Sequence, residues 1–199
     1  MSRNDTPTRI LRDQHELILK VAAVLERALS GGEASQAGAP DAWDPEAWDY
    51  DALADCIAFI RLYADALHHG KEEDLLFPEL VARGLPRQAG PIAVMLAEHA
   101  RGRAFAREMA EALPRARAGD EDAARSLRSA GLGYVDLIRG HILKENNVLF
   151  DMADRMVDGP ACRSLCQAYE GVCQRRFEGC TVAELEAIAA RLMERYPDA

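Results

Sequence analysis

The sequence has few aromatic residues, no long uncharged hydrophobic segment and no dense cluster of basic residues. Aromatic side chains make up 6% of the 199 residues, and runs of β-branched residues, which favour strands, are scarce. Alanine, leucine, glutamate and arginine are abundant, and these residues favour helices. We therefore predict an all-α protein with room for one ordinary domain.

These absences also exclude several classes of function. No segment approaches the roughly 18 uncharged residues that a membrane-spanning helix needs, and charges interrupt the first apolar turns, unlike a secretory signal. The net charge of −9 disfavours nucleic acid and anionic lipid, which clustered lysine and arginine would bind. Five cysteines, an odd number, indicate reduced thiols. We expect a cytoplasmic protein that binds neither nucleic acid nor membranes, and the sequence carries no signal for its oligomeric state.

Apolar residues at helical spacing predict four long helices. They cover residues 8–29, 44–78, 91–114 and 120–157. Asp44 should cap the second helix with Pro45 as its first residue, and Asp120 should cap the fourth. Pro78 should kink or end the second helix, because proline removes a backbone hydrogen bond. Four amphipathic helices joined by three loops favour an up-down four-helix bundle, a fold that can hold metal ions between facing helices.

A helical extension should follow the bundle. DGP at 158–160 breaks the fourth helix, and Thr181 with Glu184 matches a capping box that opens the last helix. We predict a bundle over residues 1–157 and a helical extension over 158–199 that packs on it.

A short segment of the second helix is repeated in the fourth. HHGKEEDLLF at 68–77 aligns with HILKENNVLF at 141–150, matching His68 to His141 and Glu72 to Glu145. In each copy a histidine and a glutamate lie four residues apart, on the same face of a helix. One imidazole and one carboxylate so placed can bind a common metal ion.

The first copy contains a second pair, His69 and Glu73, with the same spacing. The repeat matches these two residues to Ile142 and Asn146, neither of which preserves the pair. It therefore selects His68 and Glu72 as the ligand pair and leaves His69 and Glu73 beside the site or on the surface.

The first and third helices contribute one histidine each. The candidate metal ligands are thus His15, His68, Glu72, His99, His141 and Glu145. Two metal ions bridged by the two carboxylates could each take two of the imidazoles, leaving positions open for a small molecule. A single histidine, or one His-Glu pair, is more often an ordinary surface feature, but one histidine on each of four predicted helices is not explained in that way.

In these residues the chain resembles the hemerythrin-like, or HHE cation-binding, proteins. The resemblance rests on His15-Glu16, HHGKEEDLLFPEL, MLAEH ending at His99, and HILKENNVLF, and it covers roughly residues 8–157. It implies an up-down four-helix bundle with a non-heme di-iron centre. It also implies that His15 and His68 bind one iron and His99 and His141 the other, with Glu72 and Glu145 between them.

Two departures from the oxygen-carrying members stand out. Arg103 occupies the position of a second histidine in the third helix, and the last helix spaces its ligands as HxxxE instead of placing an aspartate five residues after the histidine. An iron with fewer imidazoles has an open position or a substitute ligand, for which His69, Glu98 and Tyr134 are candidates. Tyr134 is more readily explained as a core tyrosine with a bonded hydroxyl.

Acidic residues next to the ligands could support them. Glu16, Glu73 and Glu98 are candidates to accept hydrogen bonds from ligand imidazoles, although exposure to solvent is the simpler expectation for each.

Cysteines cluster after the bundle, at positions 162, 166, 173 and 180. On one continuous helix they would form a thiol stripe suited to metal binding or redox sensing, but Gly179 should interrupt the helix before Cys180. We favour small residues that pack the extension onto the bundle, and we expect Cys56 in the core.

The expected function is that of a di-iron protein that binds, senses or reacts with O2, NO or peroxide. Manganese or zinc could substitute for iron at such ligands. The alternatives are a di-iron oxidoreductase, acting as a peroxidase, ferroxidase or NO-reducing enzyme, and an iron-handling regulatory module.

Overall fold

The computed structural model describes residues 6–30, 44–197 and 199, and their secondary structure is helical apart from one isolated bridge between Phe177 and Cys180. The α-helices are α1 (Arg9–Leu29), α2 (Tyr50–Phe59), α3 (Phe77–Ala82), α4 (Gly90–Arg117), α5 (Glu121–Lys144), α6 (Phe150–Met156), α7 (Gly159–Cys173) and α8 (Val182–Arg195). The prediction of an all-α protein is confirmed.

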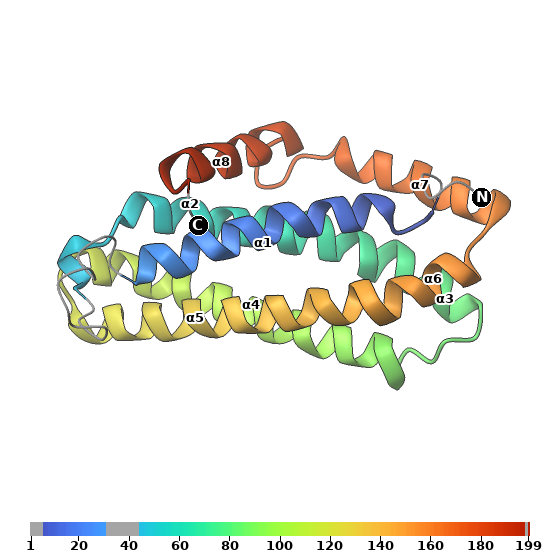
Figure 1. Ribbon diagram of the computed structural model, residues 1–199, viewed down its shortest axis with the longest axis horizontal. Helices are drawn as coiled ribbons and strands as arrows, with labels where there is room; N and C mark the ends of the chain where they lie inside the picture. The colour runs from blue at the N-terminus through green and yellow to red at the C-terminus, as the bar shows by residue number, and fades with distance from the viewer. Residues whose placement is uncertain (1–5, 31–43, 198) are drawn as a thin grey trace.

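Four antiparallel rods form the body of the molecule (Figure 1). Helices α1 and α4 are each one rod. The second rod runs from α2 through two π-helical segments, η3 (Ile60–His69) and η4 (Glu72–Leu76), into α3. The fourth runs from α5 through the π-helical segment η5 (Glu145–Leu149) into α6. The predicted up-down bundle is thus the observed architecture.

The start of the second helix differs from the prediction. Asp44 caps only a short 3₁₀ turn, η2 (Pro45–Ala47), and α2 begins at Tyr50 with Asp49 as its cap. The reason is Trp48, which takes an extended backbone (φ −71°, ψ 140°) and is 5% exposed. Burial of this indole separates the 3₁₀ turn from the helix.

Neither Pro78 nor Pro114 ends the helix in which it lies. Pro78 lies in the first turn of α3, where a missing N–H group is tolerated. Pro114 lies inside α4, which continues to Arg117. The predicted cap of the fourth helix is confirmed, since the Asp120 side chain accepts a hydrogen bond from the Ala123 N–H at 3.0 Å.

The hydrophobic core has two parts, with a polar layer between them. On α1, Leu11 belongs to one cluster and Ile18 to the other, and His15 lies between them. On α4, Met95 and Ala106 belong to the two clusters in the same way, on either side of His99. The bundle therefore surrounds its buried polar residues with apolar packing on both sides.

Helices α7 and α8 run along one side of the bundle (Figure 1). Helix α7 contacts η4, and α8 contacts α1 and α2. The predicted capping box of Thr181 and Glu184 is confirmed. Helix α7 ends at Cys173, so Cys180 lies outside it, and the division of the chain at residue 157 stays a prediction. No helix in the described ranges is both long and apolar enough to span a membrane.

Candidate metal centre

The His-Glu pairs of the repeat lie in or beside the three π-helical segments. His68 and His69 end η3, Glu72 begins η4, and Glu145 begins η5 directly after α5, which carries His141. Such turns frequently occur at functional sites, and both His-Glu pairs of the repeat lie in or directly beside one.

The first group of possible ligands contains His15, His68, Glu72 and Glu145. The Nε2 atoms of His15 and His68 are 3.0 Å apart, and His15 Nε2 lies 3.1 Å from a Glu145 oxygen. His68 Nε2 lies 3.6 Å from a Glu72 oxygen. Adjacent ligands of a metal with bonds of about 2.1 Å lie roughly 3 Å apart, so these separations suit a shared ion.

The second group contains His69, Glu72, His99 and His141. The Nε2 atoms of His99 and His141 are 3.2 Å apart. His99 Nε2 lies 3.4 Å from the second Glu72 oxygen, and His141 Nε2 lies 3.2 Å from Glu145. Glu72 thus belongs to both groups and offers one oxygen to each, as a bridging carboxylate would.

The other ring nitrogen of every histidine faces an oxygen. His15 Nδ1 lies 2.9 Å from the Asn146 amide oxygen, and His68 Nδ1 lies 3.2 Å from that of Gln14. In the second group the acceptors are carboxylates. They are Asp65 for His69 at 3.3 Å, Glu73 for His99 at 2.8 Å and Glu98 for His141 at 3.0 Å.

These contacts fix the proton on Nδ1 and leave a lone pair on each Nε2. Two lone pairs that approach to 3.0 Å, as in His15 and His68, repel one another unless a cation lies between them. The five imidazoles are therefore prepared as metal ligands through Nε2.

The two central carboxylates provide the sharpest test of whether metal ions fit. Glu72 and Glu145 are both 0% exposed. None of their four oxygens has a hydrogen-bond partner among the described residues. Two buried, unpaired carboxylates cost several kcal/mol each, and two divalent cations would remove that cost. The residues present thus fit a pair of metal ions.

The electrostatics of the centre agree with this arrangement. Burial lowers the pKa of His68, His69 and His99, which keeps these imidazoles neutral, as metal binding requires. Burial and the neighbouring Glu145 charge raise the pKa of Glu72. His141 is the exception: burial alone would lower its pKa, but the carboxylates of Glu145 and Glu98 raise it.

All six residues that the sequence predicts as ligands lie in these two groups, in the pairs that the resemblance implied. Their ligation of metal stays a prediction. His69 joins them: it is 5% exposed and stacks on His99 with ring centroids 3.8 Å apart. Of the other substitutes, Glu98 lies behind His141 and belongs to neither group, and Tyr134 also lies outside both.

Arg103 has a supporting position. Its guanidinium bonds Asp65 at 2.8 Å and Glu73 at 2.7 Å, and these two carboxylates face His69 and His99. Although burial opposes it, the contacts with His99 and Arg103 lower the pKa of Glu73 to about 2. Arg103 therefore holds the acceptors of two imidazoles.

Tyr134 corrects one expectation. It is 2% exposed, as a core tyrosine should be, but its hydroxyl has no hydrogen-bond partner in the described part of the chain. Cys56 is 0% exposed, as expected. Among the acids next to ligands, Glu73 and Glu98 accept hydrogen bonds from imidazoles, whereas Glu16 is exposed.

The sequence reasoning missed Gln14 and Asn146 as acceptors for the first group. Each directly neighbours a candidate ligand in the chain, Gln14 beside His15 and Asn146 beside Glu145. Adjacency was the only available signal, and an amide next to a histidine or glutamate is too common to be informative. It also missed Tyr169 of α7. Burial is the main cause that raises the pKa of its hydroxyl, and the nearby Glu72 carboxylate raises it further.

Loss of one imidazole acceptor should weaken one metal site. We expect Glu98→Ala and Asn146→Ala each to lower metal affinity about 10- to 100-fold, the first at the group of His141 and the second at that of His15. Anaerobic titration of the metal-free proteins with Fe(II) against a chelator would measure both. Glu16→Ala is the control, and an equal loss in that exposed variant would contradict the assigned contacts.

The comparison with known proteins agrees with this geometry. A family model described as the Hemerythrin HHE cation binding domain matches residues 6–153. Uncharacterized protein Mb2018 of Mycobacterium bovis and uncharacterized protein Rv1995 of Mycobacterium tuberculosis are each 26% identical over 130 residues, which is 63% of this chain and 49% of theirs. The chain thus spans about half the length of the curated relatives it matches. No solved structure matches it significantly.

With its helical bundle, its buried histidine and glutamate groups and a match over most of its length, the chain belongs to the hemerythrin HHE cation-binding family.

Proposed function

We propose that the chain binds two iron ions at this centre and that the pair binds, senses or reacts with O2, NO or peroxide. The observation that carries the proposal is the pair of fully buried carboxylates, Glu72 and Glu145, with imidazole Nε2 atoms turned toward them. Mixed imidazole and carboxylate ligation suits iron. When bound, the irons would supply redox chemistry and an exchangeable coordination position.

The residues of the chain would hold the two ions. Glu72 would contribute one oxygen to each ion, since its two oxygens face His68 and His99. Glu145 likewise faces His15 with one oxygen and His141 with the other. The apolar clusters on either side of the polar layer, which include the buried side chains of Leu76 and Leu149, would limit access of water to the centre.

A pocket of about 820 Å3 between η3 and α4 supports access by a small molecule. His69, Arg103 and Tyr134 are among the residues that line it. Because His69 also belongs to the second ligand group, the pocket extends from the surface to that group. A diatomic molecule or peroxide could approach the centre by this route.

The proposal is tested with protein loaded anaerobically with Fe(II). Mixing it in a stopped-flow instrument with O2, NO or peroxide should give a new visible absorption band with at least one of the three. A His68→Ala variant should show no band. A wild-type protein that holds two irons and shows no spectral change with any of the three would contradict the proposal.

A di-iron oxidoreductase is the second candidate, and one observation favours it. The Tyr134 hydroxyl is buried, has no partner among the described residues and lines the same pocket as His69. A buried O–H group there could donate a proton to a substrate, which turnover requires. Consumption of many equivalents of peroxide per centre, reduced in Tyr134→Phe, would favour catalysis, whereas a single stoichiometric event would favour binding.

A further inference from the structure

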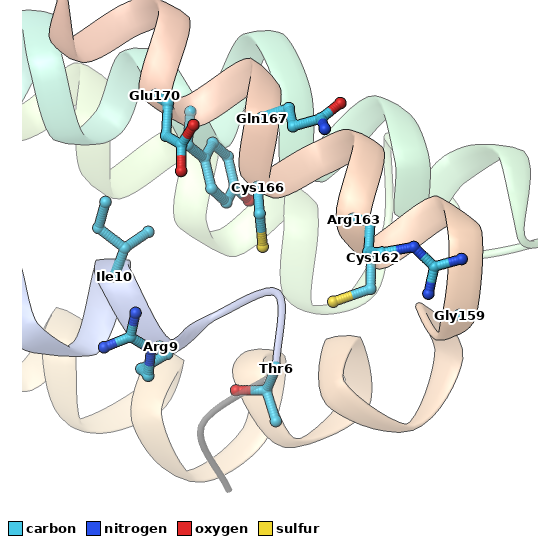
Figure 2. A pocket seen from close by; sticks show the side chains of 10 residues that line it. Thr6, Arg9, Ile10, Gly159, Cys162, Arg163, Cys166, Gln167 and Glu170 are labelled. Carbon is cyan, nitrogen blue, oxygen red and sulfur yellow. The ribbon is translucent and has the colours of Figure 1, made fainter. Parts of the chain in front are cut away.

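A second pocket, of about 460 Å3, lies between the start of α1 and α7. Figure 2 shows Cys162 and Cys166 projecting from α7 toward the chain segment that carries Thr6, Arg9 and Ile10. The volume lies in the range of roughly 300–1,000 Å3 that small-molecule sites occupy. None of the candidate metal ligands is among its described lining residues, although Tyr169, which lines it, also lies near Glu72.

The charge around this pocket differs from that of the protein as a whole. The chain carries a net charge of −9, but Arg9 and Arg163 line the pocket, with Glu170 as the one carboxylate among its described lining residues. Among the described residues, Arg9 forms an exposed ion pair with Asp13 at 3.7 Å, which is a weak interaction. The pocket is therefore a locally cationic region where an anionic group is favoured.

The start of α7 adds to this preference. Gly159, its first residue, lines the pocket. Within the described structure, Asp158 makes no side-chain cap hydrogen bond, and the first turn contains no acidic residue. Although Pro160 has no N–H group, the positive end of the helix dipole favours an anion at this end of α7.

An independent sign of a ligand comes from Tyr169, which also lines the pocket. Its side chain is 0% exposed, and its hydroxyl lacks a hydrogen-bond partner within the described ranges. A buried hydroxyl without a partner costs about 1–3 kcal/mol. A bound molecule with an acceptor oxygen would recover this cost.

The sulfur chemistry of the pocket specifies the ligand further. Cys166 is half-buried and Cys162 is buried, and both are thiols. Cys173 and Cys180 are half-buried as well, but neither lines this pocket. Cys166 is therefore accessible to solvent and lines the same pocket as Arg9 and Arg163, whose guanidinium groups attract an anionic reagent.

We propose that this pocket binds small disulfides that carry carboxylates, and that Cys166 exchanges with them to form a mixed disulfide. The Cys166 thiol loses its proton to solvent, and the thiolate attacks one sulfur of the bound disulfide. A new S–S bond forms to Cys166 while the old S–S bond breaks, and the second sulfur leaves as a thiolate. The exchange needs no further oxidant and does not use the metal centre.

The full-length, metal-loaded protein can be treated with oxidised glutathione, which carries more carboxylates than ammonium groups, and separately with cystamine, a cationic disulfide. Intact-mass spectrometry and peptide mapping follow each cysteine over time. With oxidised glutathione, Cys166 should react about tenfold faster than Cys173 or Cys180. With cystamine this preference should be absent.

Two variants separate the roles of charge and of the thiol. Arg9→Gln with Arg163→Gln should lower the rate at Cys166 toward oxidised glutathione about tenfold without slowing cystamine, and Arg101→Gln, an exposed site on α4, should change neither rate. Cys166→Ser should abolish the fast modification. Equal rates for the two reagents, or modification first at Cys162, Cys173 or Cys180, would overturn the proposal. Metal content is measured on the same samples, so a failure of the proposed iron centre would be seen separately.

Discussion

A Glu72→Gln variant should bind less than one metal ion per chain and yet be more stable than metal-free wild-type protein. Glu72 belongs to both ligand groups, is 0% exposed, and its oxygens find no hydrogen-bond partner in the described chain. Glutamine has the same shape but no charge, so the substitution removes the repulsion from Glu145 and the cost of burying the carboxylate. We expect the free energy of unfolding of the metal-free protein to rise by about 1–4 kcal/mol.

Urea denaturation and metal analysis of both proteins would measure the two effects. Glu73→Gln is the matched control, because Glu73 is the next residue but pairs with His99 and Arg103. That variant should gain no stability. A Glu72→Gln protein that keeps two metals, or is less stable without metal than the wild type, would show that Glu72 has a purely structural role.

Removal of the metals from the wild-type protein should lower its free energy of unfolding by about 5 kcal/mol. A ligand present at 100 times its dissociation constant stabilises the native state by about 2.7 kcal/mol, and two ions contribute twice. The physical source is the loss of the cations that neutralise Glu72 and Glu145, both fully buried. Denaturation with and without a chelator, under anaerobic conditions, measures the change.

The Glu72→Gln variant is the control for the chelation experiment. In Glu72→Gln, which lacks the shared ligand, chelator should change the unfolding free energy little. If the wild-type protein were equally stable with and without chelator, the buried carboxylates would need another source of compensation.

Much of this centre could be predicted from the sequence because the repeat carries long-range information. A lone His-Glu pair is uninformative, but the match of His68 and Glu72 to His141 and Glu145 places two equivalent pairs on facing helices. Helix caps such as Asp120 and Thr181 were predictable for a local reason, since each depends on residues within three positions.

Other features depend on contacts that no local pattern encodes. The repeat matches His69 to Ile142, so the sequence left it beside the site or as a substitute ligand. In the structure it stacks on His99 and belongs to the second group of possible ligands. The repeat also matches Lys71 to Lys144, yet the first is 0% exposed and the second lies at the surface, paired with Glu98.

The contribution of α7 was the least predictable part. Tyr169 lies nearly one hundred residues after Glu72 in the chain, and only packing of α7 against η4 brings the two near each other. The predicted role of the cysteines as packing residues describes Cys162, which is 5% exposed. It does not describe Cys166, which is half-buried at the edge of a pocket.

The most direct test of the metal centre is quantitative metal analysis of natively purified protein together with its absorption spectrum before and after exposure to air. Two irons per chain and a visible band that appears on oxidation and is absent in Glu72→Gln are the predicted result. A folded protein that holds no transition metal, and takes up none when Fe(II) is supplied anaerobically, would contradict it.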